Sequence, residues 1–115
     1  MLKLKDFKYL TINTECDIYW SNNTGCQYPL ICPKGTKVEF VSQFTNYYGT
    51  WFEVKYEDEI RYVLPNLCNG NVIVKAKKIV LMDSESLAIK ETYILTDRYG
   101  KRYRLLNEKG DLELL

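Results

Sequence analysis

The fold of this chain is decided by the stretch Tyr28-Pro29-Leu30-Ile31-Cys32-Pro33-Lys34-Gly35-Thr36-Lys37-Val38-Glu39-Phe40-Val41-Ser42. Two further segments, residues 51–56 and 60–63, follow it after short turns. Val38 and Phe40 fall on the same side of an extended strand, because successive side chains of a strand point to opposite faces. The same alternation continues in the two later segments, so all three are predicted to be strands of a small, strongly bent antiparallel sheet with one buried face.

Turn residues separate these predicted strands. Pro33-Lys34-Gly35 precedes the first strand, residues 46–49 form the first reversal, and Glu57-Asp58 form a tight hairpin before the third strand. The alternation also predicts which side chains form the core of the sheet. We expect these to be Val38, Phe40, Phe52, Val54, Ile60 and Tyr62.

The order of these elements resembles the bacterial Src-homology-3 domain, over about residues 8–67. Repeats of that family run as a Tyr-Pro pair, a Lys-Gly-Thr turn, an alternating Val-rich strand, a Trp-centred strand, a short hairpin and a closing Tyr-Val pair. The corresponding elements here are Tyr28-Pro29, Lys34-Gly35-Thr36, residues 38–41, residues 51–56, residues 57–58 and Tyr62-Val63. The resemblance implies a small Src-homology-3-like β-barrel, and such repeats commonly recognise cell-wall peptide or glycan.

Two departures from the family pattern limit what the resemblance implies. Residues 17–23 replace the Asn-Val-Arg-Ser-Gly-Pro-like segment of the family, and Arg61 stands where the family often has Gly. The first departure falls on a loop that commonly shapes the ligand groove of the family. Family ligands are therefore not transferred to this chain.

The second half of the chain continues the strand pattern. Predicted strands and turns there are residues 72–74, 79–82, 92–96, the turn 98–100, residues 102–106, the hairpin 107–110 and residues 111–115. Residues 83–86 could cap a helical turn through residue 90, and a polar loop explains them equally well. Tyr48-Gly49 and Tyr99-Gly100 open similar series in the two halves.

These patterns predict an all-β protein. We interpret residues 1–68 as a Src-homology-3-like barrel and residues 69–115 as a second antiparallel subdomain, which could be a degenerate repeat of the first. The alternatives are a single elaborated barrel and a pair of packed antiparallel sheets.

Composition and charge exclude several classes of protein. The chain has 115 residues, of which 46% are hydrophobic, which is enough for a core and excludes a disordered chain. Sixteen basic and fifteen acidic residues give a net charge of +1, so there is no overall field that favours nucleic acid or an anionic membrane. The N-terminal segment lacks the apolar region of a signal peptide, and no segment is long enough to span a membrane. We therefore expect a cytoplasmic protein without a membrane partner.

The four cysteines, Cys16, Cys26, Cys32 and Cys68, lack the closely spaced pair that is typical of zinc sites, and the chain contains no His. We expect reduced thiols that behave as small buried hydrophobes, with no bound metal. A disulfide among the first three is the alternative if the protein is exported.

The sequence gives little sign of catalysis. Without His, the Ser-His and Cys-His nucleophile pairs are excluded. The acidic residues at positions 57–59 are more typical of a solvated hairpin turn than of a carboxylate pair. We expect a protein that is not an enzyme and needs no cofactor, with cysteine or carboxylate chemistry as the weaker alternative.

Aromatic residues supply the main candidate binding site. Exposed rings offer a large contact area at a small entropic cost, and they dominate binding hot spots. The aromatic residues of this candidate site, which fall in or beside predicted loops, are Tyr19, Trp20, Tyr47 and Tyr48. A second candidate is a basic patch for nucleic acid or an acidic partner, made of Arg98, Lys101, Arg102 and Arg104. A charge-alternating solvent face explains the same four residues more simply.

These features favour a non-enzymatic binding module that presents an aromatic groove or a sheet edge to a protein partner. A nucleic-acid partner is the weaker expectation. Two alternatives remain open: a small phage or mobile-element protein that inhibits a host defence system, as anti-CRISPR proteins do, and a module that binds cell-wall peptide or glycan. The sequence does not indicate the partner or the oligomeric state.

Overall fold

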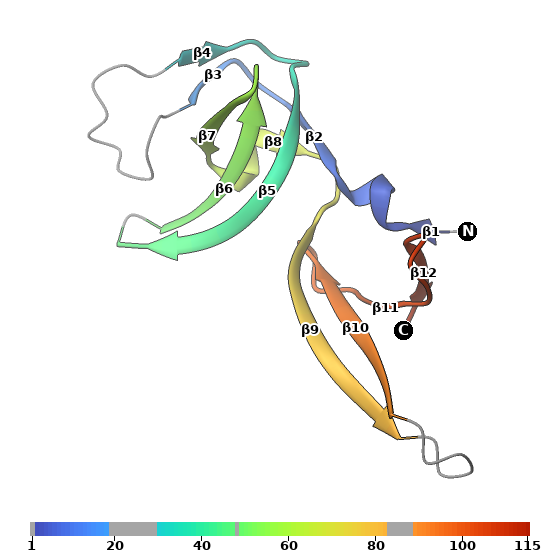
Figure 1. The fold of residues 1–115 in the computed structure, drawn as a ribbon. Helices are drawn as coiled ribbons and strands as arrows, with labels where there is room; N and C mark the ends of the chain where they lie inside the picture. The colour runs from blue at the N-terminus through green and yellow to red at the C-terminus, as the bar shows by residue number, and fades with distance from the viewer. Residues whose placement is uncertain (1, 19–29, 48, 83–88) are drawn as a thin grey trace. The chain divides into compact units, whose positions relative to one another are not determined.

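The computed structural model describes residues 2–18, 30–47, 49–82 and 89–115. These residues form antiparallel strands and two short 3₁₀ helices, which confirms the predicted all-β class (Figure 1). Several residues singled out from the sequence lie outside the described part of the chain. They are Tyr19, Trp20, Cys26, Tyr28, Pro29, Tyr48 and residues 83–88.

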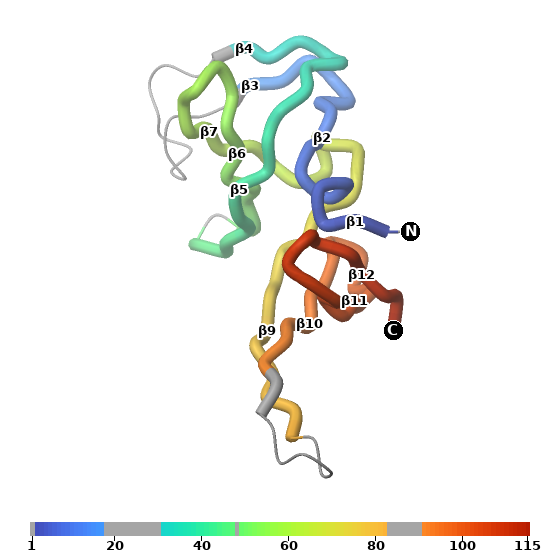
Figure 2. The backbone as a smooth tube through the Cα atoms, turned by 45° about the vertical axis from the view of Figure 1, so that its right-hand side comes forward, coloured from blue at the N-terminus to red at the C-terminus, as the bar shows by residue number. Residues whose placement is uncertain are grey.

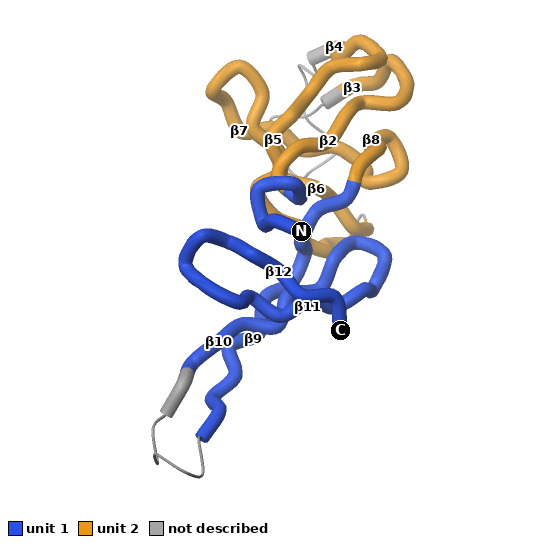
Figure 3. The backbone as a smooth tube through the Cα atoms, turned by 90° about the vertical axis from the view of Figure 1, so that its right-hand side faces the viewer, with its two compact units in different colours: residues 1–7, 71–115 blue, residues 8–70 orange. Residues whose placement is uncertain are grey.

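The chain divides into two compact units, which Figure 3 shows in different colours. Unit 2 comprises Lys8–Gly70, and unit 1 comprises Met1–Phe7 together with Asn71–Leu115. The division falls two residues after the boundary expected from the sequence at residue 68. The first seven residues, which we had placed with the first half, belong to the same unit as the second half.

Unit 2 is built around a five-stranded antiparallel sheet with the order β7-β6-β5-β2-β8. Its strands are β2 (Tyr9–Ile12), β5 (Lys37–Asn46), β6 (Gly49–Tyr56), β7 (Glu59–Val63) and β8 (Cys68–Asn69). A two-stranded hairpin of β3 (Cys16–Ile18) and β4 (Leu30–Cys32) lies between β2 and β5 in the chain, and the 3₁₀ helix η2 (Pro65–Leu67) precedes β8. β8, the last strand of the unit, thus returns to pair with β2, the first.

The hairpin between β6 and β7 decides which side of β7 is buried. Glu57 and Asp58 have φ of 50° and 62°, the positive values that a two-residue type I′ turn requires at both central positions. This turn pairs Val54 with Arg61, so Arg61 shares the face of the fully buried Val54.

The same register places Val63 opposite Phe52, and both are fully buried. Val38, Phe52 and Val54 are core residues as predicted. The prediction for β7 is wrong, because Ile60 is 41% exposed and Tyr62 is only partly buried. Phe40 is also only partly buried. The sequence prediction places Ile60 on the inner face. The two-residue turn instead pairs Val54 with Arg61 and Phe52 with Val63, so these residues of β7 face the core and Ile60 faces outward.

Unit 1 contains a second five-stranded antiparallel sheet, with the order β1-β12-β11-β10-β9. Its elements are β1 (Leu2–Lys3), the 3₁₀ helix η1 (Leu4–Phe7), β9 (Ile73–Met82), β10 (Ile89–Asp97), β11 (Arg102–Leu105) and β12 (Asp111–Leu114). Strands β9 and β10 are the longest of this sheet and run side by side in Figures 1 and 2. The predicted segments 92–96, 102–106 and 111–115 correspond to β10, β11 and β12.

The core of unit 1 joins the N-terminal segment to the later strands. Phe7, Leu95, Tyr103 and Leu112 are buried together, with Ile73 and Leu105 packed against them. The centroids of the Phe7 and Tyr103 rings are 5.1 Å apart, and the rings are tilted in an arrangement that aromatic pairs favour. Burial of Phe7 explains why the first seven residues belong to this unit.

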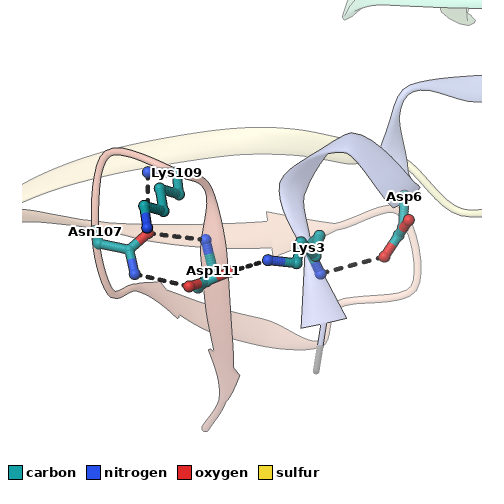
Figure 4. A network of polar contacts seen from close by, with 5 residues as sticks. All are labelled: Lys3, Asp6, Asn107, Lys109 and Asp111. Carbon is teal, nitrogen blue, oxygen red and sulfur yellow. Dashed lines mark hydrogen bonds and ion pairs between the residues drawn. The ribbon is translucent and has the colours of Figure 1, made fainter.

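A polar network attaches β1 to the turn between β11 and β12 (Figure 4). Lys3 Nζ lies 2.6 Å from Asp111 Oδ1, and Asn107 Nδ2 donates to Asp111 Oδ2 at 2.8 Å. The hydrogen bond from Asn107, and after it the one from Lys3, lower the pKa of Asp111 below its usual value of 3.8. In the turn, Gly110 has φ of 86°, and a Cβ there would lie only 3.3 Å from Leu4 Cβ. Glycine therefore allows the N-terminal segment to approach the turn.

Candidate functional site

The predicted aromatic site is described only at Tyr47, whose side chain is 95% exposed in the turn between β5 and β6. Tyr19, Trp20 and Tyr48 lie outside the described residues. An exposed ring at Tyr47 is compatible with a contact residue.

The four residues of the predicted basic patch separate into two groups. Arg98 and Lys101 belong to the turn between β10 and β11, where the Arg98 guanidinium lies 5.2 Å from the centroid of the Tyr99 ring. Arg102 and Arg104 are exposed on β11, and because they are two residues apart they project from the same face of the sheet.

The register of the sheet adds two lysines that the sequence analysis missed. Thr96 of β10 lies opposite Lys75 of β9 on one side and opposite Arg102 of β11 on the other. Ile94 likewise lies between Lys77 and Arg104. Residues directly opposite one another share a face. Two adjacent rows across the three strands therefore carry four cations on one face, which we call the basic face: Lys75, Lys77, Arg102 and Arg104. In the sequence, the two lysines and the two arginines each show an i, i+2 spacing. Only the register shows that the two pairs lie on one face, with β10 between them.

Asp97 holds the turn that leads into β11. It is 1% exposed. Its Oδ1 accepts hydrogen bonds from the backbone N–H of Tyr99 at 2.9 Å and of Lys101 at 3.0 Å. Its Oδ2 accepts from Asn71 Nδ2 and from Tyr103 Oη, both at 2.8 Å. Burial alone would raise the pKa of Asp97, but these four bonds to the ionised form lower it below 3.8. The carboxylate therefore stays charged and orders the start of β11.

A groove lies beside β10 in unit 1, with a cavity volume of about 480 Å³. It is bordered by residues of β9 and β10 and by the end of β11 with the turn that follows. The lining residues are Leu81, Glu91, Thr92, Tyr93, Arg104, Leu105, Leu106, Asn107 and Glu108. Thr92 Oγ1 donates a hydrogen bond to the carbonyl oxygen of Leu105 at 2.8 Å, and both residues line the groove.

The apolar lining of the groove is partly open to solvent. Leu81 is 44% exposed, Tyr93 is 41% exposed and Leu106 is 48% exposed. These side chains can therefore contact a ligand without any rearrangement of the core. Glu91, Arg104 and Glu108 place charges of both signs at its border, so the groove combines an apolar floor with polar groups that can orient a ligand.

The groove follows a length of β10 that has a neighbour on one side only. β11 pairs with β10 only from Ile94 to Thr96, whereas β9 pairs with it from Ile89 to Asp97. Among the described residues, no strand pairs with β10 from Ile89 to Tyr93 on the side of β11. Main-chain donors and acceptors of this length are available to an added strand.

A smaller hollow of about 340 Å³ lies in unit 2, lined by Tyr9, Lys37, Glu39, Lys55, Glu57 and Asp58. Two of its charged side chains contact neighbouring side chains. Lys37 Nζ lies 4.2 Å from the centroid of the Tyr9 ring, and Glu39 forms an ion pair with Lys8 at 3.1 Å. The groove of unit 1 is the better candidate because its apolar side chains lie beside an open strand.

Within residues 2–18, 30–47, 49–82 and 89–115, no three His, Cys, Asp or Glu side chains gather closely enough to hold a metal ion. Over the same residues, no helix has the length and apolar character needed to cross a membrane. Cys16 and Cys32 carry free thiols.

Comparison with protein-family models, curated proteins and solved structures returned no match for this chain.

Proposed function

We propose that this protein is a non-enzymatic protein-binding module that holds an extended peptide in the groove of unit 1. The single observation that carries the proposal is a length of β10, Ile89–Tyr93, that has no strand partner on the side of β11 among the described residues and lies beside a partly exposed apolar lining. A peptide added next to β10 would continue the sheet beyond the end of β11. Main-chain hydrogen bonds supply affinity in this mode of recognition, and pockets for alternate side chains supply specificity.

The chemistry of the groove indicates what kind of peptide fits. Tyr93 and Leu105 lie on one face of the sheet and offer an apolar surface to every second side chain of the peptide. Arg104 and Glu108 at the border favour a ligand with charges of both signs. The expected partner is thus a protein segment with alternating apolar and polar residues.

We also propose that unit 2 is a Src-homology-3-like barrel. The support is its chain order: one strand, a long connection that carries the β3–β4 hairpin, three hairpin-linked strands, a 3₁₀ turn and a strand that returns to the first. The predicted Trp-centred strand and short hairpin lie within this order, as β6 and the turn at Glu57 and Asp58. A barrel of this kind would serve as a scaffold or as a second binding element.

The test of the peptide groove is selection from a random peptide library displayed on phage, with the wild-type protein as bait. Peptides with alternating apolar residues should be enriched. Their binding should fall at least tenfold in Tyr93→Ala and in Leu106→Asp, because both changes remove exposed apolar contact. In nuclear magnetic resonance titrations, the amide signals of residues 89–93 should shift on binding.

Tyr47→Ala is the matched control, since it removes an exposed ring outside the groove. Loss of binding in this control with full binding in Tyr93→Ala would move the site to the β5–β6 turn and contradict the groove. Failure to enrich any peptide that distinguishes wild type from Tyr93→Ala would also contradict it.

A further inference from the structure

The basic face of unit 1, formed by Lys75, Lys77, Arg102 and Arg104, concentrates positive charge in a chain of nearly balanced charge. All four side chains are exposed. Opposite residues of neighbouring strands are about 4.8 Å apart, and i, i+2 residues about 6.7 Å apart. The four Cα atoms therefore mark a quadrilateral of about 7 by 10 Å. This is within about one Debye length at 0.1 M salt, so the four charges act together on an approaching ion.

Few acidic groups weaken this field. Among the described residues, Arg104 forms one ion pair, with its guanidinium 4.0 Å from Glu113. Within the described ranges, Lys75, Lys77 and Arg102 form no ion pair. The ion pair between Lys78 and Glu91 lies on the opposite face of the sheet, because both residues are one position out of step with the basic rows.

The composition of the face favours a phosphate backbone over a protein surface. The cores of protein interfaces are enriched in aromatic residues and depleted in Lys, whereas the described rows of this face contain two Lys and no aromatic side chain. Thr96 places a hydroxyl group between Lys75 and Arg102, and Lys, Arg and Thr are side chains that commonly contact phosphate oxygens. A second copy of the chain that presented the same face would be repelled.

From this arrangement, we infer that the basic face binds the phosphodiester backbone of double-stranded nucleic acid without reading its sequence. A single strand would be held mainly by bases stacked on aromatic rings, and the described rows offer none. The binding is independent of the peptide groove except at Arg104, which borders both sites. Arg104 is therefore left unchanged in the variants of both tests.

The test is fluorescence anisotropy with a short, labelled DNA duplex of mixed sequence, titrated over a range of KCl concentrations. Four phosphate contacts predict a slope of log K against log salt of about −3.6, which is a loss of about 100-fold in affinity between roughly 50 and 200 mM KCl. The triple variant Lys75→Gln, Lys77→Gln and Arg102→Gln should reduce the slope to about −1, because one contact remains. The groove variant Tyr93→Ala should bind the duplex as wild type does.

The matched control is the triple variant Lys34→Gln, Lys55→Gln and Lys109→Gln. It removes the same number of charges from exposed residues outside the basic face and should bind as wild type does. Equal losses in the two triple variants would assign binding to net charge and overturn the inference. So would absence of duplex binding by the wild-type protein, tighter binding of a single strand than of the duplex, or tighter binding of polyglutamate than of DNA. The wild-type measurements keep the inference falsifiable if a triple variant fails to fold.

Discussion

Cys16 and Cys32 lie directly opposite one another at the base of the β3–β4 hairpin. Opposite residues of an antiparallel pair have Cα atoms about 4.5–5.5 Å apart, a separation that a disulfide can span. Both thiols are free, with Cys32 buried and Cys16 partly exposed. Burial, and after it the neighbouring Cys32, raise the pKa of the Cys16 thiol above its usual value. Of the three pairs that the sequence left open, the register thus favours Cys16 with Cys32.

Oxidised glutathione should convert this pair to a disulfide. The Cys16 thiolate attacks glutathione disulfide and releases one glutathione, and the Cys32 thiolate then attacks the Cys16 sulfur and releases the second. Because the thiolate is the reactive form, the rate should rise with pH toward the raised pKa of Cys16. Thiol counting in denaturant should fall from four to two.

Cys32→Ser is the control for this reaction, since it should stop at a mixed disulfide of Cys16 with glutathione. Peptide mapping that finds Cys26 or Cys68 in the cross-link would contradict the pairing.

Phe7→Ala should destabilise unit 1 by about 3–5 kcal/mol, because it removes a buried ring that packs on Tyr103. Hydrogen exchange measured residue by residue should show faster exchange in β10 and β11. Exchange in β5 and β6 reports on unit 2 and serves as the internal reference. Equal acceleration in both units would show that the two do not unfold separately.

Replacement of Val63 and of Ile60 by Ala tests the orientation of β7. Val63→Ala should cost about 2 kcal/mol in free energy of unfolding, since a fully buried side chain loses two methyl groups and leaves a cavity. Ile60→Ala should cost less than about 1 kcal/mol because Ile60 is largely exposed. Urea denaturation of the two variants gives both values, and the reverse order would restore the orientation expected from the sequence.

Asp97→Asn should cost about 1.5–3 kcal/mol at pH 7, because the amide loses the charge that four donors stabilise and presents an NH₂ group to some of them. Tyr103→Phe should cost about 1 kcal/mol, since it removes one of these bonds and keeps the ring in the core. Urea denaturation at neutral pH compares both variants with wild type. A loss in Tyr103→Phe as large as that in Asp97→Asn would contradict a role shared among four donors.

The Asp97 carboxyl should also make stability depend on pH. Its folded pKa lies below the usual 3.8, so the unfolded state binds more protons in that range. The contribution of Asp97 is fully present above pH 3.8 and is lost as pH falls through the lower folded pKa. Urea denaturation at a series of pH values should therefore show the difference between wild type and Asp97→Asn shrinking below about pH 4. A difference that does not change with pH would show that Asp97 is neutral in the folded protein.

Local sequence determined several of the strands and turns. Alternating side chains marked β5, β6, β11 and β12, and the acidic pair Glu57 and Asp58 marked the β6–β7 hairpin. These features depend on side-chain period and on the φ values that a few residues tolerate. Both are properties of neighbouring residues, so they can be read without any knowledge of the rest of the fold.

Tertiary structure alone decided which residues meet. Register set Cys16 opposite Cys32, and it placed Lys75 and Lys77 on the same face as Arg102 and Arg104, with β10 between the two pairs. A shift of one residue would reverse every side chain of a strand, and the composition of a strand does not reveal that shift. The early end of β11, which leaves β10 open along the groove, likewise depends on where the pairing between the two strands stops. Binding surfaces on these sheets are therefore set by pairing between strands that are separated in the chain.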